Sequence, residues 1–179
     1  DKNHAVVAVT TGLLQILDKT ELEGVMAHEL SHIGNRDMLI ATVVVVLVGF
    51  ISIASDMFTR HLFFGRRDNN EKGGGVLVLV GIVLAVLSPI IALLIQLAIS
   101  RKREYLADAS GALLTRYPEG LANALRKIGQ HSKPMARQSS AIAHIYLADP
   151  RGSKIGKKVM GLFASHPPIA DRVKALIGE

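Results

Sequence analysis

The stretch VMAHELSHIGNRD (residues 25–37) contains His28, Glu29 and His32 in the spacing H-E-x-x-H. On a helix, residues four apart share a face, so His28 and His32 can direct two imidazole nitrogens at one metal ion with Glu29 beside them. A structural zinc ion normally has four protein ligands and favours cysteine, whereas a hydrolytic zinc ion has three and leaves the fourth position to water. The chain contains no cysteine. This stretch therefore predicts a zinc hydrolase whose third ligand lies elsewhere in the chain.

The residues before the motif favour a helix around it. Thr20 and Glu23 have the spacing of a capping box, so we expect the helix to begin at Glu21. Two neutral imidazoles on a half-buried helix face need partners, which a metal ion supplies. The alternative, a chance occurrence of the pattern on a solvated helix, is disfavoured by this context.

Upstream of the motif, residues 5–10 (AVVAVT) are small or β-branched and are followed by Gly12, which predicts a short strand. If this strand lies at a sheet edge beside the site, the backbone groups of Ala5, Val6, Val7, Ala8 and Val9 can pair with an extended peptide substrate. An ordinary core strand fits the same pattern. We therefore expect a small β element with either of these two roles.

Two long apolar runs follow the motif. Residues 38–55 contain no charge and four consecutive valines, and residues 76–99 are uncharged and include Pro89. Each run is long enough to cross a bilayer. Two buried core helices are the alternative, but the rest of a 179-residue chain is too small to surround two uniformly apolar helices. The pattern therefore predicts a transmembrane helical hairpin.

Composition and charge agree with a membrane protein. The chain is 49% hydrophobic, carries a net charge of +6 and has no recognised nucleic-acid motif, so anionic lipid explains the charge better than nucleic acid. Of the 21 lysines and arginines, 17 lie outside the loop between the two runs, which by the positive-inside rule puts the metal site in the cytoplasm. Because the chain begins at Asp1 without a signal peptide, we expect a fragment of a longer polypeptide.

The third ligand is expected after the second apolar run, because two crossings return the chain to the side on which it began. There Glu104 and Asp108 stand four residues apart on one helical face. Glu104 can complete a His-His-Glu ligand set, and Asp108 can accept the second N–H of a ligand imidazole. Alone, such a pair beside three basic residues usually marks a solvated face. The upstream motif favours metal ligation instead.

Two further residues are candidates near the site. His166 precedes two prolines in FASHPP (163–168), and this stiff turn could direct it into the cleft as a donor to the oxyanion. A capping or buried structural role fits His166 as well. Asn35, directly after the motif, is a candidate to support the ligands. The metzincin pattern is excluded, because it needs a glycine where Asn35 stands and a third histidine where Met38 stands.

At these residues the chain resembles the HtpX group of integral-membrane zinc metallopeptidases and, more distantly, the CAAX prenyl proteases. The resemblance rests on NHAVVAVTTGLLQIL (3–17), HELSHIGNRD (28–37), the two apolar runs, REYLADASGALL (103–114) and FASHPP (163–168). It implies one zinc ion held by His28, His32 and Glu104, with Glu29 as general base and Asp108 behind a ligand. His166 matches a histidine that can face the substrate. Members of this group usually carry two further spans upstream.

The expected fold is mainly α with a small β element: a zincin-like metallopeptidase domain of the gluzincin class, interrupted by a transmembrane helical hairpin. Residues 1–37 and 100–179 are the two parts of the catalytic domain, and residues 38–99 are the hairpin, with spans at 38–55 and 76–99. The resemblance implies a quality-control endopeptidase of the bacterial inner membrane, with its site facing the cytoplasm. Its expected partners are misfolded or membrane protein substrates and the lipid bilayer, with no nucleic acid; the oligomeric state stays open.

Two other functions compete with proteolysis. A catalytically silent membrane scaffold would keep the metal site without turnover, although Glu29 is retained where such a protein could lose it. A transporter with a metal gate would need ionisable residues inside its spans, and neither apolar run contains one. The ligand types alone do not select zinc over cobalt or manganese.

Overall fold

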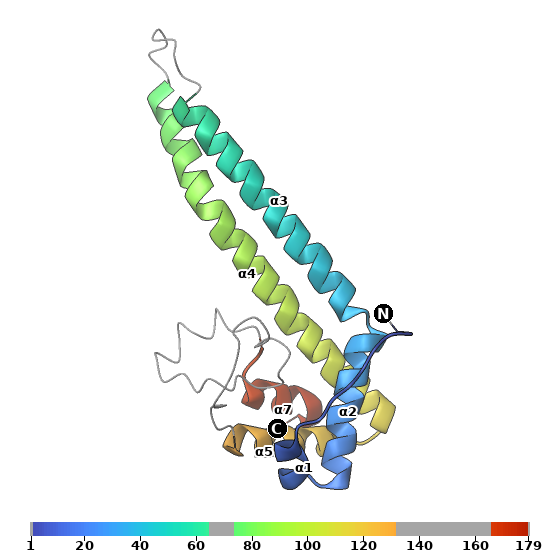
Figure 1. The fold of residues 1–179 in the computed structure, drawn as a ribbon. Coiled ribbons are helices and arrows are strands. Elements are labelled where there is room, and N and C mark those ends of the chain that lie inside the picture. The colour runs from blue at the N-terminus through green and yellow to red at the C-terminus, as the bar shows by residue number, and fades with distance from the viewer. Residues whose placement is uncertain (1, 65–73, 132–165, 179) are drawn as a thin grey trace. The chain divides into compact units, whose positions relative to one another are not determined.

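The computed structural model describes residues 2–64, 74–131 and 166–178. Its helices are α1 (Thr11–Ile16), α2 (Lys19–Gly34), α3 (Asp37–Phe64), α4 (Gly74–Thr115), α5 (Pro118–His131) and α7 (Ile169–Ile177), as Figure 1 shows. The chain divides into two compact units. We call residues 1–39 together with 98–179 the site unit, and residues 40–97 the hairpin unit.

The core of the site unit is built by α5, which packs against both α2 and α7. Helix α5 is amphipathic, and Leu121, Leu125 and Ile128 lie on its buried face. The close approach of α2 and α5 depends on Gly24, because a Cβ atom there would lie 2.7 Å from the backbone nitrogen of Leu121. The buried apolar cluster comprises Leu17, Val25, Leu121, Ala122, Ala124, Leu125, Ile128 and Val173.

Helix α2 begins two residues before the expected position. Asp18 is its N-cap: Asp18 Oδ1 accepts the N–H of Glu21 at 2.9 Å, and Glu21 Oε2 accepts the N–H of Asp18 at 2.9 Å. This capping box replaces the one predicted at Thr20 and Glu23, because the Thr20 hydroxyl instead donates to Asp18 at 2.7 Å. Lys127 of α5 binds the buried Glu21 at 2.7 Å and so ties the start of α2 to the core.

The predicted β element is wrong for the described residues, which contain no strand. Residues 5–10 still alternate in part, since Val7 and Val9 are half-buried while Val6 and Ala8 are exposed. A strand also needs a neighbouring strand to pair its backbone groups, and the described part of the chain offers none. The edge strand proposed to bind substrate at Ala5, Val6, Val7, Ala8 and Val9 is therefore not formed.

Two helix boundaries near the motif shape the site. Helix α2 ends at Gly34 and does not run straight into the first apolar run, because Arg36 adopts a left-handed conformation with φ of 56° before α3 begins at Asp37. In contrast, α4 continues without a break from the second apolar run to Thr115. The helix that carries the second apolar run therefore also carries Glu104 and Asp108.

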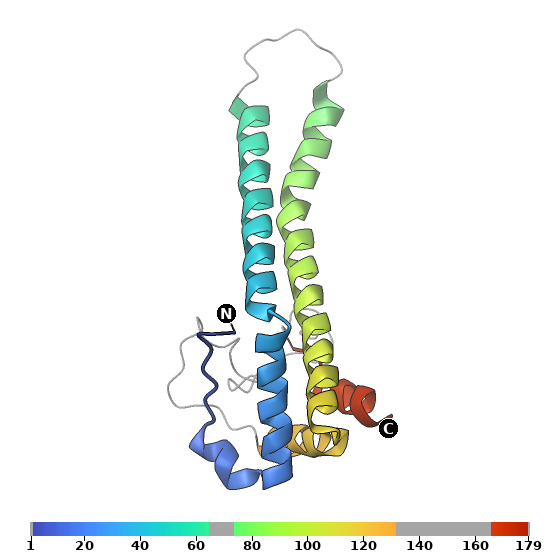
Figure 2. The same ribbon diagram turned by 90° about the vertical axis from the view of Figure 1, so that its right-hand side faces the viewer.

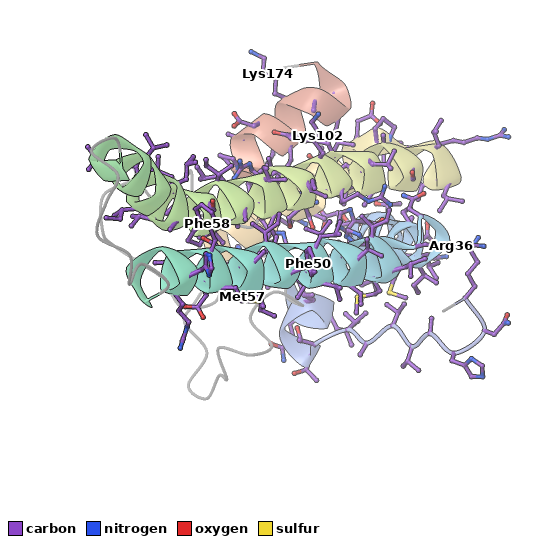
Figure 3. All side chains as sticks on the ribbon, turned by 90° about the horizontal axis from the view of Figure 1, so that it is seen from above. Arg36, Phe50, Met57, Phe58, Lys102 and Lys174 are labelled. Atoms are coloured by element: carbon purple, nitrogen blue, oxygen red, sulfur yellow. The ribbon has the colours of Figure 1, made fainter. Side chains whose placement is uncertain are left out.

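The hairpin unit consists of the parts of α3 and α4 that run side by side in opposite directions (Figures 1 and 2). Both helices contain a candidate membrane span with a mean hydropathy of 2.7. In the most apolar 18-residue window of each helix, 0% of the residues of α3 and 6% of those of α4 are buried. Phe50, Met57 and Phe58, labelled in Figure 3, are more than half exposed. Within the hairpin unit, Ser55 Oγ of α3 donates a hydrogen bond to the Ala85 carbonyl of α4 at 3.3 Å.

Candidate metal centre

Three side chains from α2 and α4 converge in the site unit. His28 Nε2 lies 3.1 Å from His32 Nε2, and the carboxylate of Glu104 lies 3.8 Å from the first nitrogen and 3.7 Å from the second. His28 is fully buried and Glu104 is 6% exposed. The two histidines meet because residues four apart share a helix face, and Glu104 reaches them from the other helix.

The close approach of α4 to the motif depends on Gly111. A Cβ atom at Gly111 would lie 3.0 Å from the backbone nitrogen of His28. Ala107, one turn earlier on α4, is fully buried. Small residues on this face of α4 therefore let its backbone lie against α2, which brings Glu104 within reach of the imidazoles.

The second ring nitrogen of each histidine lies against a carboxylate. His28 Nδ1 is 3.0 Å from Asp108 Oδ1, and His32 Nδ1 is 2.6 Å from Asp37 Oδ2. A carboxylate only accepts hydrogen bonds, so both rings carry their proton on Nδ1 when they are neutral. The two Nε2 atoms then face each other and the oxygens of Glu104, and the Arg172 guanidinium supplies one cation beside them, with Nη2 3.5 Å from His28 Nε2 and Nη1 3.2 Å from Glu104 Oε2.

The spacing and charge of these groups fit a divalent metal ion. Two imidazole nitrogens bound tetrahedrally to zinc lie about 3.3 Å apart, close to the separation observed here. Around the ligands, the carboxylates of Glu29, Asp37, Glu104 and Asp108 are grouped with the guanidinium groups of Arg103 and Arg172. With neutral imidazoles, four negative and two positive charges leave a net charge of −2, which one divalent cation neutralises. The donor set therefore fits zinc.

Arg172 of α7 is the buried cation of the cluster, with 1% of its surface exposed. It donates two hydrogen bonds to Asp108, at 2.8 and 2.6 Å, and its Nη1 lies 3.2 Å from Glu104 Oε2. A charge this deeply buried is tolerable only when it is paired, and two carboxylates pair it here. Arg172 therefore binds both the candidate ligand Glu104 and Asp108, the acid beside His28.

The two buried acids are kept ionised by these contacts. Burial alone would raise the pKa of Glu104, but His166, Arg172 and His28 outweigh it and lower that pKa below its ordinary value. Burial also opposes ionisation of Asp108, and hydrogen bonds from Arg172 and His28 lower its pKa in the same way. A carboxylate must be deprotonated to bind a metal ion or to accept an imidazole N–H. The site thus has its acids in the form that ligation requires.

The remaining candidate residues have different positions. Glu29 is half-buried and close enough to Arg172 to stabilise its charge. His166 Nδ1 lies 3.1 Å from Glu104 Oε1, so it contacts a candidate ligand. Asn35 binds other groups: its side chain donates to Ser110 Oγ at 3.3 Å, and its carbonyl accepts from Arg103 at 2.8 Å.

Sequence reasoning missed Asp37, Arg103 and Arg172. Arg172 could have been found from helical periodicity, because it lies between Ile169 and Leu176 on the buried face of α7, where a cation needs a partner. Asp37 gave no such signal, since five residues separate it from His32 and an unbroken helix would point the two in different directions. Its contact depends on the left-handed turn at Arg36, which the sequence does not indicate.

Comparison with known proteins supports the same chemistry. The model of a family described as peptidase family M48 matches residues 2–179. A protein named "Protease HtpX homolog" from Caldanaerobacter subterraneus subsp. tengcongensis is 50% identical over 181 residues, and one from Tropheryma whipplei (strain Twist) is 48% identical over 178. Both alignments cover 98% of the chain and 59% of the relative, so the chain spans about three fifths of the length of these relatives. No solved structure matches the chain.

Proposed function

The chain belongs to peptidase family M48, and we propose that it is the metal-binding part of a membrane-associated zinc endopeptidase. The observation that carries this proposal is the convergence of His28 Nε2, His32 Nε2 and the Glu104 carboxylate within 4.8 Å of one another. Three ligands of this kind leave a coordination position open to water, which is typical of hydrolytic zinc sites of the gluzincin class.

Each residue of the site has a separate task in the proposed reaction. Zinc, when bound, supplies a Lewis acid that acidifies a water molecule and polarises the scissile carbonyl. Glu29 accepts the proton from the attacking water and passes it to the leaving amine. Arg172 and His166 hold Glu104 as a carboxylate, since both lie within 3.2 Å of its oxygens. His166 Nε2 makes no hydrogen bond within the described residues, and because Nδ1 faces the Glu104 carboxylate, Nε2 can donate to a substrate carbonyl only when the ring is protonated on both nitrogens.

Two crossings of a bilayer by α3 and α4 are part of the proposal. Their apolar windows are almost entirely unburied, so core packing does not account for them. The basic residues cluster at 101–103, directly after the second run, and most others also lie outside the loop between the runs. This distribution supports an inner-membrane protein whose metal site faces the cytoplasm.

The proposed substrates are unfolded or membrane proteins close to the bilayer. Relatives named as HtpX proteases support proteolysis, and their names say nothing of a substrate. A catalytically silent metal-binding scaffold is the second candidate, and zinc binding alone does not separate it from a peptidase. Turnover does.

The test is cleavage of an unfolded protein by the purified full-length protein, with zinc content measured in parallel. We expect Glu29→Gln to retain zinc and to lose about 10²- to 10⁴-fold in kcat, because the general base is removed while the ligands stay. The matched control is Glu23→Gln on the same helix, whose side chain is 59% exposed and lies 3.9 Å from Lys19. This control should cleave at the parental rate.

Two results would count against the proposal. A parent protein that binds zinc but cleaves no substrate would favour the silent scaffold. Equal cleavage by the parent and by Glu29→Gln, with zinc retained, would remove Glu29 as the general base.

A further inference from the structure

Asp37, the first residue of α3, binds two groups of the site unit. Its Oδ2 atom lies 2.6 Å from His32 Nδ1, and its Oδ1 atom forms an ion pair with Arg103 Nη2. The side chain of Asp37 is 11% exposed and that of Arg103 is 21% exposed, so both groups are largely shielded from water. The same Arg103 atom donates to the carbonyl of Asn35 at 2.8 Å.

The contact between Asp37 and His32 exists only because the helix is interrupted. Successive residues of an α-helix are rotated by about 100°, so residues five apart point about 140° away from each other. Arg36 breaks this geometry by adopting a φ of 56°, which is uncommon for a residue with a side chain. The turn brings the carboxylate back to the imidazole, and Arg103 caps the turn by binding both Asp37 and the Asn35 carbonyl.

The chemical consequence is a fixed orientation of one ring. His32 is 24% exposed, more than His28, and its ring would otherwise be free to rotate or to exchange tautomers. A carboxylate on Nδ1 holds the proton there, leaves Nε2 as the donor to a metal ion, and makes that donor more basic. Arg103 in turn fixes the carboxylate, since an Asp held by a guanidinium has little freedom to turn away.

We propose that Asp37, clamped by Arg103, is the positioning residue for His32 and thereby sets the affinity of the site for zinc. This inference rests on the proposed function, because it takes His32 to be a metal ligand. Asp37 would orient His32 as Asp108 orients His28, so each imidazole has its own carboxylate. The carboxylate for His32 belongs to the first residue of α3.

The test is the dissociation constant for Zn²⁺ of the purified full-length protein, measured by competition with a chelating indicator. We expect Asp37→Asn to bind Zn²⁺ about 10- to 100-fold more weakly than the parent. Arg103→Met should weaken binding by a smaller factor, because Asp37 stays but loses its clamp. The matched control is Asp56→Asn, also on α3, whose exposed carboxylate pairs with Arg60 at 2.8 Å. This control should leave the dissociation constant unchanged.

A second measurement separates positioning from a merely structural role. The melting temperature of the EDTA-treated protein reports the fold without metal. A lower melting temperature for Asp37→Asn with an unchanged Zn²⁺ dissociation constant would overturn the inference and leave the proposed function standing. A parent protein that binds no Zn²⁺ would overturn both.

Discussion

The site unit and the hairpin unit differ in which side chains they bury: the first buries charged side chains, and the second exposes apolar ones. In the site unit, charged groups are hidden, with Arg172 1% exposed and Asp108 2% exposed. In the hairpin unit, apolar side chains such as Val46, Phe50 and Met57 are 63–69% exposed. The first arrangement is stable only if every buried charge has a partner, and the second only if the surrounding medium is itself apolar.

This contrast shows that the two regions depend on different interactions. The site unit contains buried ion pairs around a candidate metal position, and small residues such as Gly24 and Gly111 permit the close packing of the helices that carry them. The hairpin unit leaves most of its apolar side chains exposed in the described residues, and its proposed place is a lipid bilayer. Substitutions that look alike in the sequence should therefore have unlike effects in the two units.

The largest expected effect in the site unit comes from its buried cation. Arg172→Met should lower the free energy of unfolding of the metal-free protein by about 3–5 kcal/mol, because Asp108 and Glu104 lose the charge that pairs them. Lys174→Met is the control on the same helix, at an exposed position, and should change stability by less than about 0.5 kcal/mol. Denaturant titration in detergent, followed by circular dichroism, measures both. Equal effects of the two substitutions would mean that the buried pair is not what stabilises this unit.

In the hairpin unit, a charge placed on an exposed valine tests the surrounding medium. Val46→Arg should disfavour membrane insertion by about 2.5–3.5 kcal/mol, the cost of arginine near the middle of a span. Val6→Arg makes the same substitution at a valine of the site unit that is 92% exposed, and it should leave insertion unchanged. The fraction of protein that resists alkaline extraction from membranes measures insertion. If both variants stayed in the membrane as the parent does, residues 38–55 would not form a span.

The smallest expected effect separates packing from helix propensity in α2. Gly24→Ala should destabilise the protein by about 1–3 kcal/mol, because the new methyl group would meet the α5 backbone at 2.7 Å. Gly34→Ala adds the same group where nothing lies within 4 Å, so it should be neutral or stabilise by up to about 1 kcal/mol. Melting temperatures give both values. A loss at Gly34 as large as that at Gly24 would argue against tight packing of α2 on α5.

Periodic features of this chain could be predicted from its sequence. The apolar runs are visible as long uncharged stretches, and α5 is recognisable because its apolar residues repeat with the period of a helix. The grouping of His28, His32 and Glu104 could also be anticipated, since the motif defines two ligands and a hairpin returns the chain to them. Their roles as ligands remain a prediction.

Features that depend on tertiary contacts could not be predicted in this way. The strand expected at residues 5–10 follows from local propensity, and no pairing partner is present among the described residues. Asp37 reaches His32 through one left-handed residue, and a single unusual φ angle leaves no periodic signal. Asp18 and Thr20 can both cap the start of α2, and local sequence rules do not decide between them. In the structure Asp18 is the N-cap.

The continuity of α4 joins the second apolar run directly to a residue of the candidate metal site. Glu104 follows the last residue of the second apolar run, Ile99, by five positions on the same helix, which corresponds to a rise of about 7.5 Å. No loop separates the run from this residue, so inserting one residue between them would turn the Glu104 side chain by about 100° around the helix axis. The spacing along α4 is therefore as much a part of the candidate site as the side chains that form it.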